Sequence, residues 1–165
     1  MKGAYQSLDR HYRYWLIHQW DERWPLLCVI GLHPSRTDDL KGDRTRQRVI
    51  GLAIGLGFGG VLMLNIGAYR AGNPHDWKTA ADPFGPENSV QHLADYIARF
   101  KPAKVVVAWG KNCKSEPARL PAANLLAQLP KVYCWGRNTD GTPKHPGSIS
   151  LDTPLVQCRV KTTVL

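Results

Sequence analysis

The sequence lacks the marks of an exported or membrane-embedded protein. No apolar run approaches the roughly 20 residues that a membrane-spanning helix needs. The N-terminal segment MKGAYQSLDRHYRY has no apolar core of the kind that a signal peptide carries. From these two absences we expect a cytoplasmic protein without a membrane partner.

Cysteine is scarce, and the motifs of the common cofactor and metal sites are missing. The four cysteines form no C-x-x-C pair, which argues against a zinc ribbon or redox motif and favours buried free thiols. The glycines of GLAIGLGFGG follow a predicted helix rather than a strand, an order that excludes a dinucleotide-binding fingerprint. Walker A, H-E-x-x-H and G-x-S-x-G motifs are also absent. We expect neither a metal nor a cofactor.

Acidic residues are outnumbered by basic ones. The 165-residue chain has 22 Lys and Arg against 13 Asp and Glu, a formal net charge of +9. Such an excess suits a polyanionic partner such as nucleic acid, although charge alone does not establish one. The hydrophobic fraction of 43% is that of a globular protein. We expect one monomeric domain over 1–165, with its core over about 12–156.

Apolar, strand-like segments alternate with segments of helical spacing. A turn at 21–23 is expected to join the first two strands as a hairpin, and Asp43 can cap the first helix. A long loop from Tyr69 to Gly85 precedes a helix that begins near Pro86. The predicted strands are 12–20, 26–32, 60–68, 103–110 and 131–136, and the predicted helices are 43–56, 86–100 and 121–129.

This alternation predicts right-handed βαβ units. The expected fold is α/β, a three-layer α/β/α sandwich whose mainly parallel sheet has about four strands, with the N-terminal hairpin strand added antiparallel. In such sheets, the loops that leave the carboxyl ends of the strands line the ligand crevice. Those loops are GLHPSRTDD, NIGAYRAGNP, WGKNCKS and GRNTDGTPKHPGS, and they hold most of the polar residues of chemical interest.

Candidate catalytic groups follow the second predicted strand. His33 precedes Pro34, which favours an extended backbone, so its ring can project from the strand end and polarise water or bond a leaving group. Asp38 and Asp39 lie in the same loop and can activate water, orient His33 or bind a metal. The alternatives are a loop histidine bonded to backbone, and carboxylates that cap the next helix.

Two further candidates come from later loops. Asn65 ends an apolar strand, where an amide needs hydrogen-bond partners, and it can read the edge of a nucleobase or tie two loops together. His145 lies between Lys144 and Pro146 in a stiffened segment, where it can stabilise developing negative charge or contact a phosphate.

Basic residues gather at the start of the first helix and in the long loop. Arg70 follows Tyr69 in that loop. The helix set is Lys41, Arg44, Arg46 and Arg48. These residues can follow a phosphate backbone or form a solvated surface.

Taken in order, the strand-end motifs resemble an uncharacterised family of bacterial and phage proteins that is classed as a domain of unknown function. The segments that carry the resemblance are WPLLCVIGLHPSRTDD, GGVLMLNIGAYRAGNPHD, ADPFGPEN, VVVAWG and KHP. The resemblance covers about residues 12–156 and implies a fold, but no activity.

The same motifs resemble, more distantly, the uracil-DNA glycosylase superfamily. The matching segments are GLHP at 31–34, VLMLN at 61–65 followed by YRAG, AWG at 108–110 and HPGS at 145–148. His33 stands where that superfamily has the Asp or Asn that positions the attacking water. The superfamily's strand asparagine reads a flipped base, and the histidine of its last motif stabilises the departing base.

This resemblance implies base flipping and cleavage of an N-glycosidic bond through an oxocarbenium-like transition state. The implied catalytic residues are His33, Asp38 and His145. The implied substrate-binding residues are Gly31, Pro34, Ser35, Asn65, Tyr69 and Trp109, with Tyr69 or Trp109 stacking on the base. The implied phosphate-binding residues are Arg36, Arg70 and Lys144.

The predicted function is a base-processing enzyme that acts on nucleic acid, DNA rather than RNA, or on a nucleotide. One alternative is a non-catalytic nucleic-acid-binding module that keeps a base-recognition pocket. Another is an enzyme that acts on a free small metabolite. Every catalytic version requires that His33, Asn65 and His145 converge on one cavity.

Overall fold

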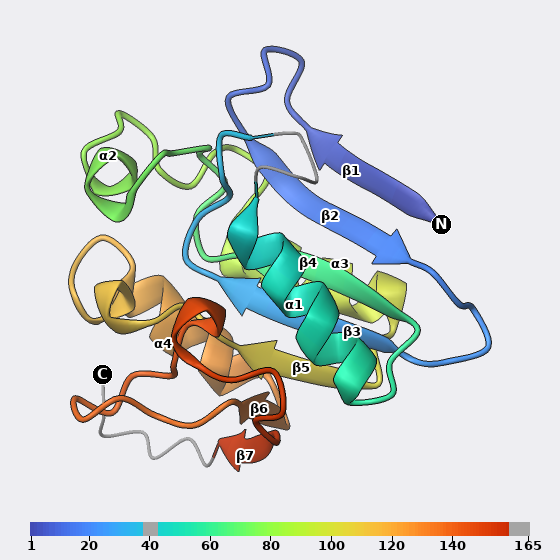
Figure 1. Cartoon of the computed structure of the whole chain (residues 1–165). Coiled ribbons are helices and arrows are strands. Elements are labelled where there is room, and N and C mark those ends of the chain that lie inside the picture. The colour runs from blue at the N-terminus through green and yellow to red at the C-terminus, as the bar shows by residue number, and fades with distance from the viewer. Residues whose placement is uncertain (38–42, 159–165) are drawn as a thin grey trace.

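The computed structural model describes residues 1–37 and 43–158, which form a seven-stranded sheet with helices on both faces (Figure 1). The strands are β1 (Lys2–Gln6), β2 (Arg13–Gln19), β3 (Leu26–Gly31), β4 (Gly60–Asn65), β5 (Lys104–Val107), β6 (Val132–Cys134) and β7 (Val156–Cys158). The helices of these residues are α1 (Arg44–Gly55), α2 (Pro74–Lys78), α3 (Val90–Phe100) and α4 (Arg119–Gln128), with short 3-10 helices η1 (Lys111–Lys114) and η2 (Pro146–Ser148). The chain is a mixed α/β protein, as predicted.

The strands are arranged in the order β1-β2-β4-β3-β5-β6-β7. The four strands β3, β4, β5 and β6 run parallel, as their apolar segments predicted, and β2 joins the sheet antiparallel to β4. All residues of β3 except Gly31 are buried, because helices cover both faces of the sheet. This central strand therefore ends at the place where a ligand crevice is expected.

Two features of the sheet differ from the sequence prediction. The strands β2 and β3 do not pair as a hairpin, because β4 lies between them, and the hairpin partner of β2 is β1. The sheet also has two edge strands, β1 and β7, that the apolar pattern missed. β1 is mostly exposed and β7 has only 3 residues, so neither has the long apolar run that identifies a buried strand.

Two hydrophobic clusters lie on opposite faces of the sheet. Leu27 of β3 belongs to one cluster, together with Leu52 of α1. Cys28, the next residue of the strand, belongs to the other cluster, together with Leu93 of α3 and Leu125 of α4. Because successive side chains of a strand point to opposite faces, α1 covers one face and α3 and α4 cover the other (Figure 1). The expected three layers result.

Capping side chains determine where two of the helices begin. Asp43 caps α1 as predicted, since its side chain accepts a hydrogen bond from the backbone N–H of Arg46 at 2.9 Å. Ser89 caps α3 through a capping box, so this helix begins at Val90 and not near Pro86.

The four cysteines are free and buried, as predicted. Within residues 1–37 and 43–158, no helix is long and apolar enough to cross a membrane. The same residues contain no group of three or more His, Cys, Asp and Glu side chains that is placed to hold a metal ion.

Candidate functional site

A pocket opens at the carboxyl ends of β3 and β4. Its volume is about 510 Å³. Several residues predicted for the site line it: Gly31, His33, Pro34, Ser35, Asn65, Trp109 and His145. Segments that lie far apart in the sequence therefore converge on one hollow, which we call the site pocket.

His33 enters the site pocket from the loop after β3. Its ring stacks on Trp77 of α2, with centroids 6.3 Å apart and ring planes 12° apart. Nδ1 lies 3.2 Å from the carbonyl oxygen of Pro34, and because a carbonyl only accepts, Nδ1 carries the hydrogen and leaves Nε2 as an acceptor. Burial lowers the pKa of His33 and His145 lowers it further, while the hydrogen bond to Pro34 and the carboxylate of Asp76 partly oppose this. The ring is therefore neutral at pH 7.

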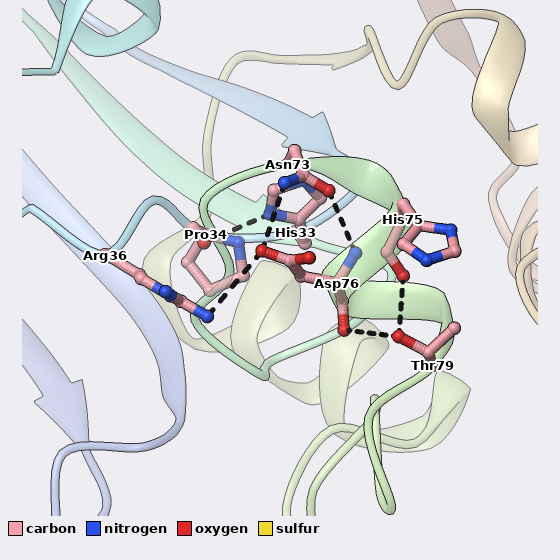
Figure 2. A network of polar contacts seen from close by, with 7 residues as sticks. All are labelled: His33, Pro34, Arg36, Asn73, His75, Asp76 and Thr79. Atoms are coloured by element: carbon pink, nitrogen blue, oxygen red, sulfur yellow. Dashed lines mark hydrogen bonds and ion pairs between the residues drawn. The ribbon is translucent and has the colours of Figure 1, made fainter.

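The α2 segment, which the sequence predicted as part of one long loop, supports His33. Asn73 caps α2 by accepting from the backbone N–H of Asp76 at 2.9 Å, and its amide donates to the Asp76 carboxylate at 3.0 Å (Figure 2). Arg36 forms an ion pair with the same carboxylate at 3.7 Å. The network joins the loop after β3 to the loop after β4, so the two loops hold one arrangement around His33.

Trp77 is fixed in place beneath this network. It is fully buried, and its Nε1–H donates to the carbonyl oxygen of Pro83 at 2.8 Å. A glycine is required at position 67, because a Cβ on Gly67 would lie 2.1 Å from Nε1 of Trp77. The indole therefore gives His33 a rigid surface to stack on.

Asn65 brings its amide to the site pocket from the end of β4. Hydrogen-bond geometry orients the amide nitrogen toward the carbonyl oxygens of Leu64 and His33, each at 3.3 Å. With the NH₂ group engaged in this way, Oδ1 is the amide group left to accept from a ligand. The buried Asn88 holds the same strand end, donating to the carbonyl oxygens of Asn65 at 3.1 Å and Ile66 at 2.8 Å.

His145 reaches the site pocket from the loop after β6. Its Nδ1 accepts from the backbone N–H of Gly147 at 3.0 Å, so Nδ1 carries no hydrogen and Nε2 carries it instead. His145 lies at the exposed rim, but the surrounding protein still desolvates the ring and lowers its pKa, with Asp43 opposing. Arg48 of α1 fixes this segment by donating to the carbonyl oxygen of Pro146 at 2.9 Å.

The two histidines that line the pocket differ in which ring nitrogen carries the hydrogen. His33 offers a bare Nε2, and His145 offers an Nε2–H. Both rings are neutral at pH 7, because burial lowers both pKa values. One ring can take a proton from water while the other donates to a developing negative charge.

Tyr69 and Arg70 support the site and do not line the pocket. Tyr69 packs edge-on against Tyr12, with ring centroids 5.9 Å apart. Arg70 is 8% exposed and donates to the carbonyl oxygens of Ser35 and Arg10, each at 3.2 Å. The structure places both residues in the framework of the loops and not at the positions expected for stacking on a base and holding a phosphate.

The other predicted residues lie beside the pocket or beyond the described part of the chain. Arg36 is exposed and Lys144 is half-buried, and neither lines the site pocket. Arg36 directly follows Ser35, and Lys144 directly precedes His145; both Ser35 and His145 line the pocket. Asp38 and its neighbour Asp39 lie outside the described residues.

Sequence patterns did not indicate Arg13, Asp43 or Asn112 as site residues, yet all three line the pocket. Asp43 was expected only to cap α1, and its place at the pocket follows from where that helix begins. Arg13 starts β2, and the antiparallel pairing of β2 with β4 brings it to the same edge of the sheet. The start of a strand has no pattern that would reveal this position.

Comparisons with known proteins identify a family but no activity. The family described as "Protein of unknown function (DUF1643)" matches residues 13–147. No curated protein matches the chain. A solved structure described as "Putative hydrolase from Agrobacterium vitis S4" is similar at 17% identity and a TM-score of 0.39, over 78% of this chain and 45% of that one. This chain therefore spans less than half the length of that protein, and so low a similarity says nothing of function.

Proposed function

The chain belongs to this family of unknown function, DUF1643, and we propose that it hydrolyses the N-glycosidic bond of a nucleotide unit in nucleic acid, DNA rather than RNA. The observation that carries the proposal is the pairing of an acceptor on His33 with a donor on His145 at one pocket that also holds Asn65. A volume of about 510 Å³ lies within the range of pockets that bind small ligands.

The two histidines divide the proposed reaction. Nε2 of His33 accepts a proton from a water molecule as the water oxygen bonds to the anomeric carbon of the sugar. The bond from that carbon to the base breaks, its electron pair leaves with the base, and the sugar passes through an oxocarbenium-like transition state. Nε2–H of His145 donates to the negative charge on the departing base. The proton on His33 returns to the base through solvent, which leaves an abasic sugar and a free base.

The other pocket residues would recognise the base. Oδ1 of Asn65 can accept from an N–H group at the base edge, because the amide NH₂ is engaged by carbonyl oxygens. Trp109 is 3% exposed and supplies apolar surface to the pocket. Gly31, at the end of β3, and Pro34 and Ser35, in the loop after it, also line the pocket. Burial of the base between these groups would exclude water from its edge.

The order of the motifs supports a uracil-DNA-glycosylase-like architecture as part of the proposal. Each of the four segments of that resemblance contributes a lining residue, namely Gly31, Asn65, Trp109 and His145. The net charge of +9 suits DNA as the partner. Arg36 and Lys144, next to the pocket in sequence, are the proposed phosphate contacts.

Base release tests the proposal directly. The protein is incubated with single-stranded and duplex oligodeoxynucleotides that contain uracil or hypoxanthine, and abasic sites are detected by strand cleavage in alkali. We expect abasic sites with at least one of these substrates. Tight binding without any abasic site would contradict hydrolysis and favour a base-recognition module, whereas neither binding nor release would favour a metabolite enzyme.

Gly31 makes room for the Asn65 amide, which provides a test of base recognition. A Cβ at position 31 would lie 2.7 Å from that amide, so Gly31→Ala must displace it. We expect the variant to raise KM for base release by about tenfold, in line with the usual penalty of overpacking. Gly72→Ala is a matched control in the same pocket, because its Cβ would meet only Asp76 Oδ2 at 3.8 Å. If the two substitutions raise KM equally, Asn65 takes no part in base recognition.

A further inference from the structure

A second hollow, of about 520 Å³, lies between α1 and the strands β1 and β2. Its charged lining residues are Lys2, Arg10, Arg13 and Arg46. No carboxylate from the described part of the chain joins them in the lining. We call this feature the basic hollow.

The basic hollow exists because the sheet is wider than its helical cover on this face. Helix α1 lies over β3 and β4, whereas β1 and β2 extend beyond it (Figure 1). Lys2 pairs with His18 and Ala4 pairs with Leu16, and residues directly opposite one another in an antiparallel pair share a face. The small side chain of Ala4 leaves room above β1.

Arg46 of α1 borders this hollow as a buried cation. It is 7% exposed, and its Nε has no hydrogen-bond partner among the described residues. Burial lowers the pKa of Arg46, and the carboxylate of Asp43 opposes this. A guanidinium that is buried with an unmet donor is unfavourable, so an anion in the hollow would stabilise the protein.

His18 of β2 experiences the same excess of positive charge. Burial lowers its pKa, and the charges of Lys2 and Arg46 lower it further. Its Nδ1 is also buried without a hydrogen-bond partner within residues 1–37 and 43–158. His18 and Arg46 thus both lie where cationic side chains outnumber carboxylates among the described residues.

Arg13 connects the basic hollow to the site pocket, since it lines both and is 5% exposed. We propose that the basic hollow is a phosphate-binding subsite, which holds a phosphate group of the ligand whose base enters the site pocket. Arginine guanidinium groups suit this chemistry, because their N–H donors match the oxygens of a phosphate. The link to a base rests on the proposed function, whereas phosphate binding depends only on the side chains of the hollow.

Thermal unfolding in inorganic phosphate tests the subsite. At constant pH and ionic strength, phosphate should raise the melting temperature of the wild type, because a ligand of the folded state stabilises it. Lys2→Gln and Arg46→Gln should each weaken phosphate affinity by about tenfold or more. Arg119→Gln is the control, since it removes one exposed positive charge, paired with Glu116, outside the hollow.

Arg46→Gln has a second expected effect that a purely structural arginine would not show. Without phosphate, the variant should melt at the same temperature as the wild type or higher, because it no longer buries a positive charge. A lower melting temperature of this variant, together with an unchanged response of Lys2→Gln to phosphate, would overturn the proposal. The proposal would also be overturned if phosphate raised the melting temperature of the wild type no more than chloride of equal ionic strength does.

The base-release assay separates this proposal from the proposed function. Phosphate binding that depends on Lys2 and Arg46, without any base release, would leave the subsite standing and reject N-glycosidic hydrolysis. Base release without a rise in melting temperature in phosphate would reject the subsite and leave N-glycosidic hydrolysis standing. If an oligothymidylate binds at least about tenfold more tightly than thymidine monophosphate and Arg46→Gln removes the difference, the phosphate belongs to a strand. If the oligothymidylate and thymidine monophosphate bind with equal affinity, and Arg46→Gln weakens both, the phosphate belongs to a free nucleotide.

Discussion

Replacing His33 with glutamine is expected to slow base release by about 10²- to 10⁴-fold, the usual contribution of a general base. Glutamine keeps a polar side chain but has no ring nitrogen that can take up a proton. The pKa of His33 is lowered by burial, so its Nε2 is free to act at neutral pH. The wild-type rate should be constant there and should fall only at a pH lower than the ordinary histidine pKa of about 6.5, because burial lowers the pKa of His33. In the His33→Gln variant, the decrease in rate that comes from protonation of His33 should be absent.

His75→Gln is the matched control for this experiment. His75 is exposed on α2, and Figure 2 shows it on the side of Asp76 away from His33. The control should keep both the rate and the pH profile of the wild type. If His33→Gln also keeps them, His33 takes no proton in the reaction, and the mechanism proposed for it is wrong.

Replacing Trp77 with alanine is expected to lower the free energy of unfolding by about 3–5 kcal/mol, as is usual for a buried aromatic side chain. Trp77 is 0% exposed and packs edge-on against Phe84, with ring centroids 5.8 Å apart. The substitution also removes the hydrogen bond to Pro83 and the surface on which His33 stacks. Urea unfolding followed by circular dichroism gives the difference between variant and wild type.

Trp24→Ala separates the loss of buried packing from the loss of any tryptophan. Trp24 is 57% exposed, so its removal should change the free energy of unfolding by no more than about 0.5 kcal/mol. In conditions where both variants are fully folded, base release should be slower only for Trp77→Ala, because only that change frees the His33 ring. Similar losses of stability in the two variants would show that Trp77 does not anchor the α2 segment.

The parallel core could be predicted because its signals are local. Long apolar runs identify β3, β4 and β5, most of whose residues are buried against helices on both faces. The cap at Asp43 is likewise visible within a few residues. Strand pairing is not local: β3 follows β2 in the sequence, but β2 pairs with β4, which comes after the whole of α1. The hairpin prediction failed for this reason, and β1 and β7 were missed because exposed or very short strands have little apolar pattern.

The amino-acid sequence by itself determined the α/β class, the parallel core and the polar residues at the strand ends. Only the tertiary structure decided that His33, Asn65 and His145 meet in one pocket and which ring nitrogens carry hydrogen there. It alone brought Arg13 and Arg46 together beside β1 in a second hollow. The physical reason is that hydrophobic periodicity depends only on residues that are close in the sequence. How the whole sheet and its loops pack decides instead which distant side chains meet and which carbonyl groups they bond to.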